Sequence, residues 1–318
     1  MGLDITALTA SLGAYHRQNS AELYTRLLKK EYSMKLFRTV AGVKDQYIAT
    51  ELEMKDMVQA YQKAWTPTAN PKFWPEILKT YRLKIDWAFE PAELEKTWEG
   101  ARIDGSRIEG QELLESYIHD RIFEQVKKQL EYSEIFSGIY AAPTPGTASA
   151  AGTNMQGLKA QIAAAITATK ITPVVTGAIT QSTAREKFEQ VFDAIPVDYQ
   201  SEELLMLCSP ELARFYNRDY RTEFGATNVY QGMSQELAPT MIDGTQCKIT
   251  PCPGLAGSQR IIATTPNNLV RLIDGEGEDT SLNLTFTRNR REIEVMGDFK
   301  MGVGFPIIQG LVWTNDQV

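Results

Sequence analysis

The sequence predicts an α+β fold, because strictly alternating strands and a long helical stripe occupy separate parts of the chain. From Tyr81 to Phe89, large apolar residues alternate with polar or small ones, as in a half-buried strand. From Ile108 to Phe136, apolar residues recur every four positions, which predicts a long helix. A second alternation, from Leu282 to Val295, predicts a hairpin whose polar turn is Arg288–Arg290.

Composition places the chain among ordinary globular proteins. Its 318 residues suffice for one large or two medium domains, and 43% are hydrophobic while 23% are charged. The longest apolar stretches are too short to span a membrane, and no secretion signal follows Met1, so we expect a soluble protein with no membrane partner. Three cysteines are too few for a disulfide framework, which favours a reducing compartment.

The formal net charge of -7 argues against a protein that coats nucleic acid, because neutralising phosphates requires dense Lys and Arg. It does not argue against a DNA container. A mildly acidic wall encloses DNA without adhering to it.

The first part of the chain predicts two segments that reach outward. Residues Asn19–Tyr32 carry Leu23 and Leu27 on one helical face and predict an amphipathic arm helix. Residues Ala64–Pro75 hold three prolines and three large aromatics, and the prolines predict a loop. Such aromatics need a surface to bury against, which another chain can supply. The candidate intersubunit contacts are therefore Trp65, Phe73, Trp74, Leu23 and Leu27.

The stripe of the long helix drifts by about 40° at each four-residue step, which favours a helix laid across a sheet over a coiled coil. Lys127 is expected on its solvent side. The helix should end at Gly138, and the run Pro143–Gly146 with the small residues up to Gly152 predicts a hinge-like connector. We expect this connector, with Gly100 and Gly105, to absorb rotations between parts of the subunit.

A compact α/β segment should follow. Thr183–Glu186 matches a capping box, and it predicts a helix whose inward residues are Phe188, Val191, Phe192 and Ile195. Leu204–Cys208 predicts a buried strand, and Ser209-Pro210 should begin another helix that ends at Gly225.

No set of residues predicts a catalytic, cofactor or metal site. His16 and His119 are expected on helix surfaces, and no nucleophile–base pair can be proposed. Cys247 and Cys252 have the wrong spacing for a zinc site and are expected to be simple thiols. The run Asp274–Asp279 imitates half of a calcium loop, but Thr285 stands where a bidentate Glu is needed, so a solvated turn is expected. Residues 2–6 match the myristoylation pattern, which is short enough to arise by chance.

The order of these elements, with the local character of Ser209–Gly232 and Thr265–Trp313, resembles the major capsid protein of tailed double-stranded-DNA bacteriophages. The resemblance implies the tailed-phage major capsid protein fold, the Hong Kong 97 type. It divides the chain into five parts: an N-terminal arm (1–35), an extended hairpin loop (36–100), a peripheral domain with a spine helix (101–152), an axial domain (153–244) and return strands of both domains (245–318).

The resemblance also implies a function without enzymatic activity or cofactors. The chain would self-assemble into hexamers and pentamers that form an icosahedral shell, and it would enclose DNA without binding it specifically. Its partners would be its own copies, a portal protein, a scaffolding protein and decoration or head-completion proteins. It would be made in the cytoplasm of the bacterial host and reside in the virion. No fused scaffold segment and no crosslinking Lys/Asn/Glu trio can be identified in the sequence.

Two other classes stay open at this point. An encapsulin-type compartment would share the fold but enclose a cargo enzyme, and its gene would stand beside that enzyme rather than beside portal and terminase genes. A soluble α/β enzyme or binding module is the remote alternative, and it would elute as a small oligomer in size-exclusion chromatography.

Overall fold

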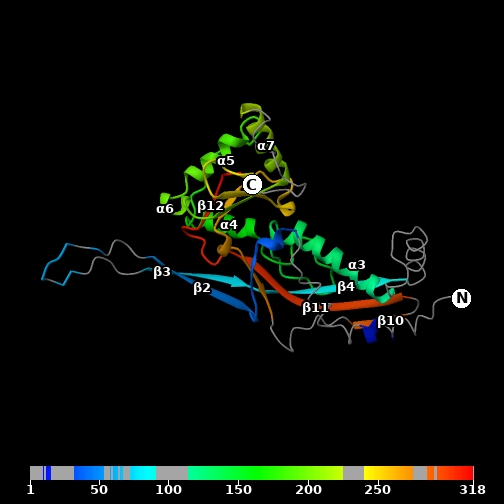
Figure 1. The fold of residues 1–318 in the computed structure, drawn as a ribbon. Coiled ribbons are helices and arrows are strands. Elements are labelled where there is room, and N and C mark those ends of the chain that lie inside the picture. The colour runs from blue at the N-terminus through cyan, green and yellow to red at the C-terminus, as the bar shows by residue number, and fades with distance from the viewer. Residues whose placement is uncertain are drawn as a thin grey trace.

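The subunit consists of two lobes and a projecting two-stranded ribbon (Figure 1). The computed structural model describes residues 10, 12–15, 32–53, 58, 60–63, 65–66, 72–90, 114–224, 240–274, 285–289 and 292–317. In Figure 1 the lobe with α5 and α7 lies above the lobe with β4, β11 and α3, and the ribbon of β2 and β3 leads away to the left. Several predictions concern residues outside the described part of the chain: the arm helix with Leu23 and Leu27, His16, Gly100, Gly105, residues 2–6 and residues 275–279.

The lower lobe is built on a five-stranded sheet with β11 at its centre. β11 bonds to β4 on one side and to β10 and β9 on the other, and β9 continues the sheet to β1. The β1 strand runs parallel to β9, and the other pairs are antiparallel. The strands of this sheet are β1 (Arg38–Val40), β4 (Tyr81–Phe89), β9 (Val270–Ile273), β10 (Thr285–Asn289) and β11 (Glu292–Gly304).

The two alternating patterns in the sequence are both strands of this sheet. The strand predicted at Tyr81–Phe89 is confirmed as β4, and Leu83 and Phe89 are buried on its predicted inner face. The predicted hairpin is confirmed as β10 and β11, although Arg288 and Asn289 continue β10 instead of forming the turn. They stay in the strand because they pair with the backbone of β11, whose 13 residues extend the ladder beyond the predicted element.

The predicted spine helix is confirmed as α3 (Leu114–Gln129), and it continues as a π-helix, η2 (Leu130–Ile135). In the α-helical part a four-residue step overshoots one turn, whereas a π-turn holds more residues, so the same step falls short of a turn. The π-segment therefore counteracts the drift of the stripe, and Ile135 and Phe136 are buried in the same core as Ile118 and Ile122.

Two predictions about the spine surface are wrong. His119 and Lys127 were expected to face solvent, but both side chains are buried. The buried stripe is two residues wide, because His119 lies beside Ile118 and packs near the rings of Tyr15 and Phe123. The aliphatic part of a Lys side chain such as Lys127 can lie along an apolar surface. The polarity of the residue type alone therefore does not predict whether that side chain is buried.

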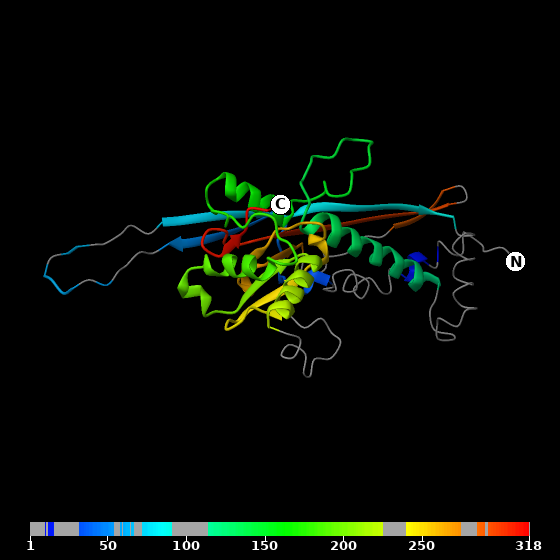
Figure 2. The same ribbon diagram turned by 90° about the horizontal axis from the view of Figure 1, so that it is seen from above.

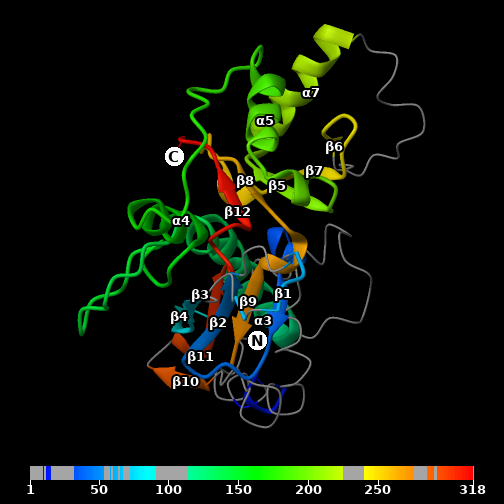
Figure 3. The same cartoon turned by 90° about the vertical axis from the view of Figure 1, so that its left-hand side faces the viewer.

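The upper lobe contains a second five-stranded sheet, in the order β12-β8-β5-β7-β6, with α5 and α7 above it (Figure 3). β5 lies at its centre, parallel to β7 and antiparallel to β8. The strands are β5 (Leu204–Cys208), β6 (Thr240–Met241), β7 (Cys247–Pro251), β8 (Ile262–Thr264) and β12 (Val312–Thr314). The helices and short turns of the subunit, apart from the spine, are η1 (Tyr32–Leu36), α4 (Leu158–Thr167), α5 (Ala184–Asp193), α6 (Val197–Gln200), α7 (Pro210–Phe224), η3 (Pro253–Leu255) and η4 (Pro266–Asn268).

β5 connects the two lobes because its opposite faces belong to different cores. Leu204, Met206 and Cys208 pack with α5 and α7, whereas Leu205 and Leu207 pack with the core around the spine helix. The predicted buried strand is therefore confirmed, and it is buried on both faces. Neighbouring strands share this division, because Ile262 of β8 and Val312 of β12 join the spine core.

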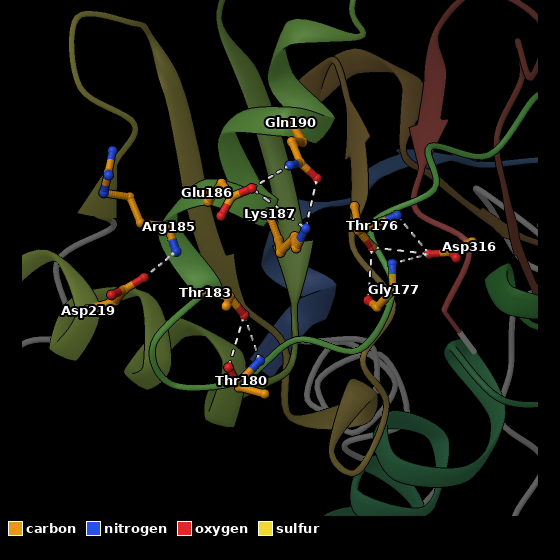
Figure 4. A network of polar contacts seen from close by, with 10 residues as sticks. All are labelled: Thr176, Gly177, Thr180, Thr183, Arg185, Glu186, Lys187, Gln190, Asp219 and Asp316. Carbon is orange, nitrogen blue, oxygen red and sulfur yellow. Dashed lines mark hydrogen bonds and ion pairs between the residues drawn. The ribbon is translucent and has the colours of Figure 1, made fainter.

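The helix predicted after Thr183 is confirmed as α5, and its predicted inward residues are buried. The predicted capping box is wrong. The Thr183 hydroxyl accepts a hydrogen bond from the backbone N–H of Thr180 (3.1 Å), and the Glu186 carboxylate accepts one from Gln190 (2.8 Å; Figure 4). Asp219 of α7 instead accepts a hydrogen bond from the backbone N–H of Arg185 (2.9 Å), so the first turn of α5 is satisfied by the neighbouring helix. The helix predicted after Ser209 is confirmed as α7, whose Leu212 N–H donates to the Ser209 hydroxyl.

The C-terminal segment closes the upper lobe through buried polar contacts. The Asp316 carboxylate accepts hydrogen bonds from the backbone N–H groups of Thr176 (3.1 Å) and Gly177 (3.2 Å; Figure 4). Asn315 is fully buried, and its side chain accepts from the Ile261 N–H and donates to the Gln259 carbonyl, both at 2.9 Å. Residues far apart in the chain are thus joined by one amide side chain.

The connector after the spine is an exposed loop, and the prediction that it is a hinge is wrong. The Ile139 N–H donates to the Gly152 carbonyl (2.8 Å) and the Ala141 N–H to the Thr153 carbonyl (3.0 Å), so the two ends of the loop are bonded to each other. The loop stands away from the body (Figure 2). A segment that leaves and returns at one place cannot absorb rotation between the lobes. No helix among the described residues is long and apolar enough to cross a bilayer.

Ile122 tests the position of the spine. Ile122→Asp should place a charge in the core and reduce the free energy of unfolding by more than about 4 kcal/mol, so that little folded protein remains. Gln125 lies three residues further along the same helix and is exposed, so Gln125→Asp should change the free energy of unfolding by less than about 0.5 kcal/mol. Chemical denaturation followed by circular dichroism measures both, and equal stability of the two variants would contradict the assigned face.

Asn315 tests the closure of the upper lobe. Asn315→Ala should leave a buried N–H and a buried carbonyl without partners and lower the free energy of unfolding by about 2–4 kcal/mol. Gln317→Ala, which removes one hydrogen bond from a half-buried side chain, is the control and should cost less than about 0.5 kcal/mol. A wild-type melting curve for Asn315→Ala would show that the C-terminal segment does not hold the lobe together.

Candidate intersubunit surfaces

A two-stranded ribbon, β2 (Gln46–Glu53) and β3 (Lys72–Lys79), projects from the subunit. The two strands are antiparallel, and they pair from Gln46 with Lys79 at the base to Glu53 with Lys72 at the far end. Each is an edge strand, because no other strand pairs with either among the described residues. The ribbon leads away from the body in two views (Figures 1 and 2).

Part of the predicted loop is wrong, because it lies in the ribbon. The segment Ala64–Pro75 was expected to be irregular, but Phe73, Trp74 and Pro75 lie in β3. Pro75 pairs with Thr50, and a proline is tolerated there because each strand of a two-stranded ribbon has a free edge toward which the missing N–H can point. The prolines therefore mark an edge strand.

One face of the ribbon is apolar and open to solvent. Ile48 pairs with Ile77 across the ribbon, so their side chains lie on one face, and Phe73 lies on the same face because it is four residues from Ile77. These three side chains are 53–62% exposed, an unusual state for large apolar residues brought together on a regular element. No described part of the subunit covers this face.

The base of the ribbon is fixed to the body. On the opposite face Leu78 is buried with Val43 and Leu272, in a small core beside the lower sheet. Glu76 forms an ion pair with Lys170, which follows α4, and the Thr80 N–H donates to the Asp45 carbonyl (2.8 Å). One face thus anchors the ribbon, while the other is presented outward.

The predicted contact residues fall partly on this surface. Phe73 lies on the apolar face, and Trp65, toward the tip, is 90% exposed. Trp74 is in β3, and the structure does not describe its side chain. The contact role of all five predicted residues stays a prediction. Sequence reasoning missed Ile48 and Ile77, because neither stands in an apolar alternation and only the register of the ribbon brings them together.

A second exposed surface is the loop between Ile139 and Gly152. Its residues 139–151 are all exposed, including the large side chains of Ile139 and Tyr140. The ring of Tyr140 lies against that of Tyr81, with centroids 4.8 Å apart. The returning end is bonded to the Glu134 carboxylate, so a fixed base carries an exposed tip.

The outward face of the lower sheet carries balanced charges. Arg82 pairs with Asp298 at 2.8 Å across β4 and β11, and Lys300 pairs with Asp274 at 2.8 Å. Exposed pairs of this kind contribute little to stability. They do leave the face without the excess of cations that phosphate binding requires.

The remaining reactive groups are poorly placed for chemistry. All three cysteines are buried, and burial raises the pKa of Cys247 and of Cys252 to about 12, so both thiols stay protonated at neutral pH. Cys208 and Cys252 pack in different cores, on opposite sides of the upper sheet. Within the described part of the chain, no three His, Cys, Asp or Glu side chains gather closely enough to hold a metal ion.

Solved structures share this architecture. A chain of the procapsid of satellite phage P4, a particle that includes the size determination (Sid) protein, matches with a TM-score of 0.60 and 10% identity, over 98% of this chain and 97% of that chain. A chain of the capsid asymmetric unit of cyanophage A-1(L) matches with a TM-score of 0.54 and 11% identity, over 88% and 90%. A chain from Gordonia phage Cozz matches with a TM-score of 0.53 and 10% identity, over 88% and 84%.

No protein-family model and no curated protein matches the sequence. Identities of 10–11% show a shared fold and leave the function to be argued from the surfaces. The chain has the α+β fold of tailed-phage major capsid proteins, the Hong Kong 97 type predicted from the order of its elements.

Proposed function

We propose that this chain is a structural protein, the major capsid protein of a tailed bacteriophage. Its copies assemble into hexamers and pentamers, and these form the icosahedral shell that encloses the phage genome. The observation that carries the proposal is the outward apolar face of the ribbon, which a subunit working alone would leave in water. The chains that share its fold come from phage particles.

The ribbon fits a second copy of the chain as its partner. Covering Ile48, Phe73 and Ile77 gains roughly 1.5–3 kcal/mol for each side chain that becomes fully buried. Much of this gain offsets the loss of freedom on association, so a single contact is weak. In a closed shell every subunit both donates and receives such a contact, and many weak contacts together give a stable particle that can still correct errors during assembly.

The other partners follow from the same role. A portal protein, a scaffolding protein and decoration or head-completion proteins would bind this shell, and the protein would reside in the virion after synthesis in the cytoplasm of the bacterial host. DNA would be enclosed without specific binding, which agrees with the net charge of -7 and the paired cations Arg82 and Lys300. No catalytic step is part of this function.

We also propose how the lobes correspond to capsid domains. The lower lobe with the spine would be the peripheral domain, the upper lobe the axial domain, and the ribbon the extended hairpin loop. α4 packs with the spine core through Leu158 and Ile162, whereas the upper core begins at Ile179. The peripheral domain would therefore include α4, and the axial domain would begin after it instead of at residue 153.

The ribbon face gives the direct test. The double variant Phe73→Thr/Ile77→Thr places residues of high strand propensity at both positions but removes two of the three large side chains of the apolar face, so the subunit should fold and fail to close shells. Lys79→Thr is the matched control, since Lys79 is exposed on the same strand and face, and it should assemble as the wild type does.

Circular dichroism melting and electron microscopy on the same preparations, with the scaffolding protein supplied where assembly needs it, separate folding from assembly. Normal shells from the double variant would show that the ribbon face is not an intersubunit contact. Wild-type protein that stays monomeric at high concentration with scaffold present would contradict the capsid function itself.

A further inference from the structure

Two buried carboxylates lie on the same π-helical turn at the end of the spine, and they differ in how they are satisfied. Glu131 and Glu134 are each 1% exposed. Burying a carboxylate in its charged form is costly unless its oxygens receive hydrogen bonds or a cation. The partners of each group therefore indicate its protonation state.

Glu134 has hydrogen-bond donors on both of its carboxyl oxygens. Its Oε1 accepts hydrogen bonds from the Gly152 N–H (2.8 Å) and from Asn154 Nδ2 (2.6 Å), and its Oε2 accepts one from the Asn154 N–H (3.2 Å). Both oxygens are used. The group holds the returning end of the exposed loop to the spine.

Glu131 is only half satisfied. Its Oε1 accepts hydrogen bonds from the Ser33 hydroxyl (2.6 Å) and the Gly254 N–H (3.2 Å). Its Oε2 is buried and has no hydrogen-bond partner among the described residues. Among the described residues, no Lys or Arg side chain forms an ion pair with Glu131. An ionised Glu131 would therefore leave a buried charged oxygen without a protein donor, whereas a protonated one would carry no charge there.

Three short helical turns meet at this carboxyl group. Ser33 belongs to η1, Glu131 to η2 and Gly254 to η3, and the backbones of η2 and η3 approach so closely that a Cβ on Gly254 would overlap the Glu131 carbonyl oxygen. Met34 and Phe37, in and just after η1, are buried in the spine core. Glu131 thus stands where the N-terminal segment, the spine and the connection between β7 and β8 come together.

The neighbouring titratable groups do not replace the missing partner. From the η3 side the Cys252 thiol approaches Glu131, and it stays neutral because burial raises its pKa to about 12. On the spine, Lys127 lies one turn before Glu131, and these two side chains form no ion pair with each other. Glu134, three residues after Glu131, is a second carboxyl group and is bonded to Gly152 and Asn154. On η1 the charged residue is Lys35, which is exposed. Burial raises the pKa of the Glu131 carboxyl above its ordinary value, against the lowering effect of the hydrogen bonds from Ser33 and Gly254.

We propose that Glu131 is a proton-controlled latch, which holds η1 firmly against η2 and η3 when its carboxyl group is protonated and weakens that attachment when the group is ionised. Detaching η1 lets water reach the carboxylate, so ionisation favours the detached state. The buried side chains of Met34 and Phe37 keep η1 attached in both states, and the proton sets how often it opens. This inference concerns the single subunit and does not depend on the proposed capsid function.

The direction of the pH dependence follows from the raised pKa. Attachment is at full strength below the ordinary glutamate pKa and is lost as the pH rises through the higher pKa of the attached state. Between the ordinary pKa and the raised pKa, the equilibrium constant for attachment of η1 should fall by up to about tenfold for each pH unit. Above the raised pKa this constant should no longer change with pH.

Hydrogen–deuterium exchange on the full-length protein tests the latch. Protection factors for peptides covering Tyr32–Phe37, corrected for intrinsic exchange, would be compared from about pH 4 to about pH 9 with those of β5 as an internal reference. The wild type should lose η1 protection as the pH rises. Glu131→Gln, which mimics the protonated group, should keep high protection with no pH dependence. Glu134→Gln should keep the wild-type pH profile at η1 and lose protection only around Gly152–Asn154.

A pH-independent η1 in the wild type, or an unchanged pH profile in Glu131→Gln, would overturn the latch. If Glu131→Gln does not fold, Ser33→Ala decides the question, since it removes the hydroxyl donor on η1 and leaves the Ser33 backbone N–H and the carboxyl group in place. It should lower η1 protection severalfold at every pH and leave β5 unchanged. Wild-type protection of η1 in Ser33→Ala would overturn the proposal as well.

Discussion

The structure depends on one strand that is buried on both faces. β5 places Leu204, Met206 and Cys208 under the helices of the upper lobe, and Leu205 and Leu207 in the core of the spine. Movement of one lobe against the other would expose one side of this strand, so we expect the two lobes to behave as a single rigid body. Flexibility is left to what projects from that body: the ribbon and the exposed loop after the spine. This combination suits the proposed role in a shell, in which a rigid body would set the curvature and a projecting ribbon would adapt to its neighbour.

Much of the fold was accessible from the sequence, because local patterns decide those elements. The alternation of Tyr81–Phe89 indicates a strand buried on one face, and the apolar run Leu204–Cys208 indicates a strand buried on both faces. Both segments are strands. The failures share a physical cause. Lys127 and His119 are polar by type but buried by position, since the buried stripe of the spine is wider than the row of its apolar residues. The Thr183 capping box failed because Asp219, distant in the chain, satisfies the first turn of α5.

The candidate site was accessible only in part. An aromatic, proline-rich segment was correctly expected to stand away from the core, and Trp65 and Phe73 are exposed. Its regularity was missed because the ban on proline within strands does not hold at a free edge, where Pro75 lies. Ile48 and Ile77 could not be singled out one at a time, since an exposed apolar residue is informative only beside another, and their meeting depends on a register between distant segments.

The rigidity of the two-lobed body is the central claim, and calorimetry of the isolated subunit tests it most directly. If β5 unites the two cores, the lobes should unfold in one transition whose calorimetric and van't Hoff enthalpies agree, even though the subunit is large enough for separate domains. Two resolved transitions, or a calorimetric enthalpy well above the van't Hoff value, would contradict the claim. Either result would show that the lobes unfold independently and can move at their junction.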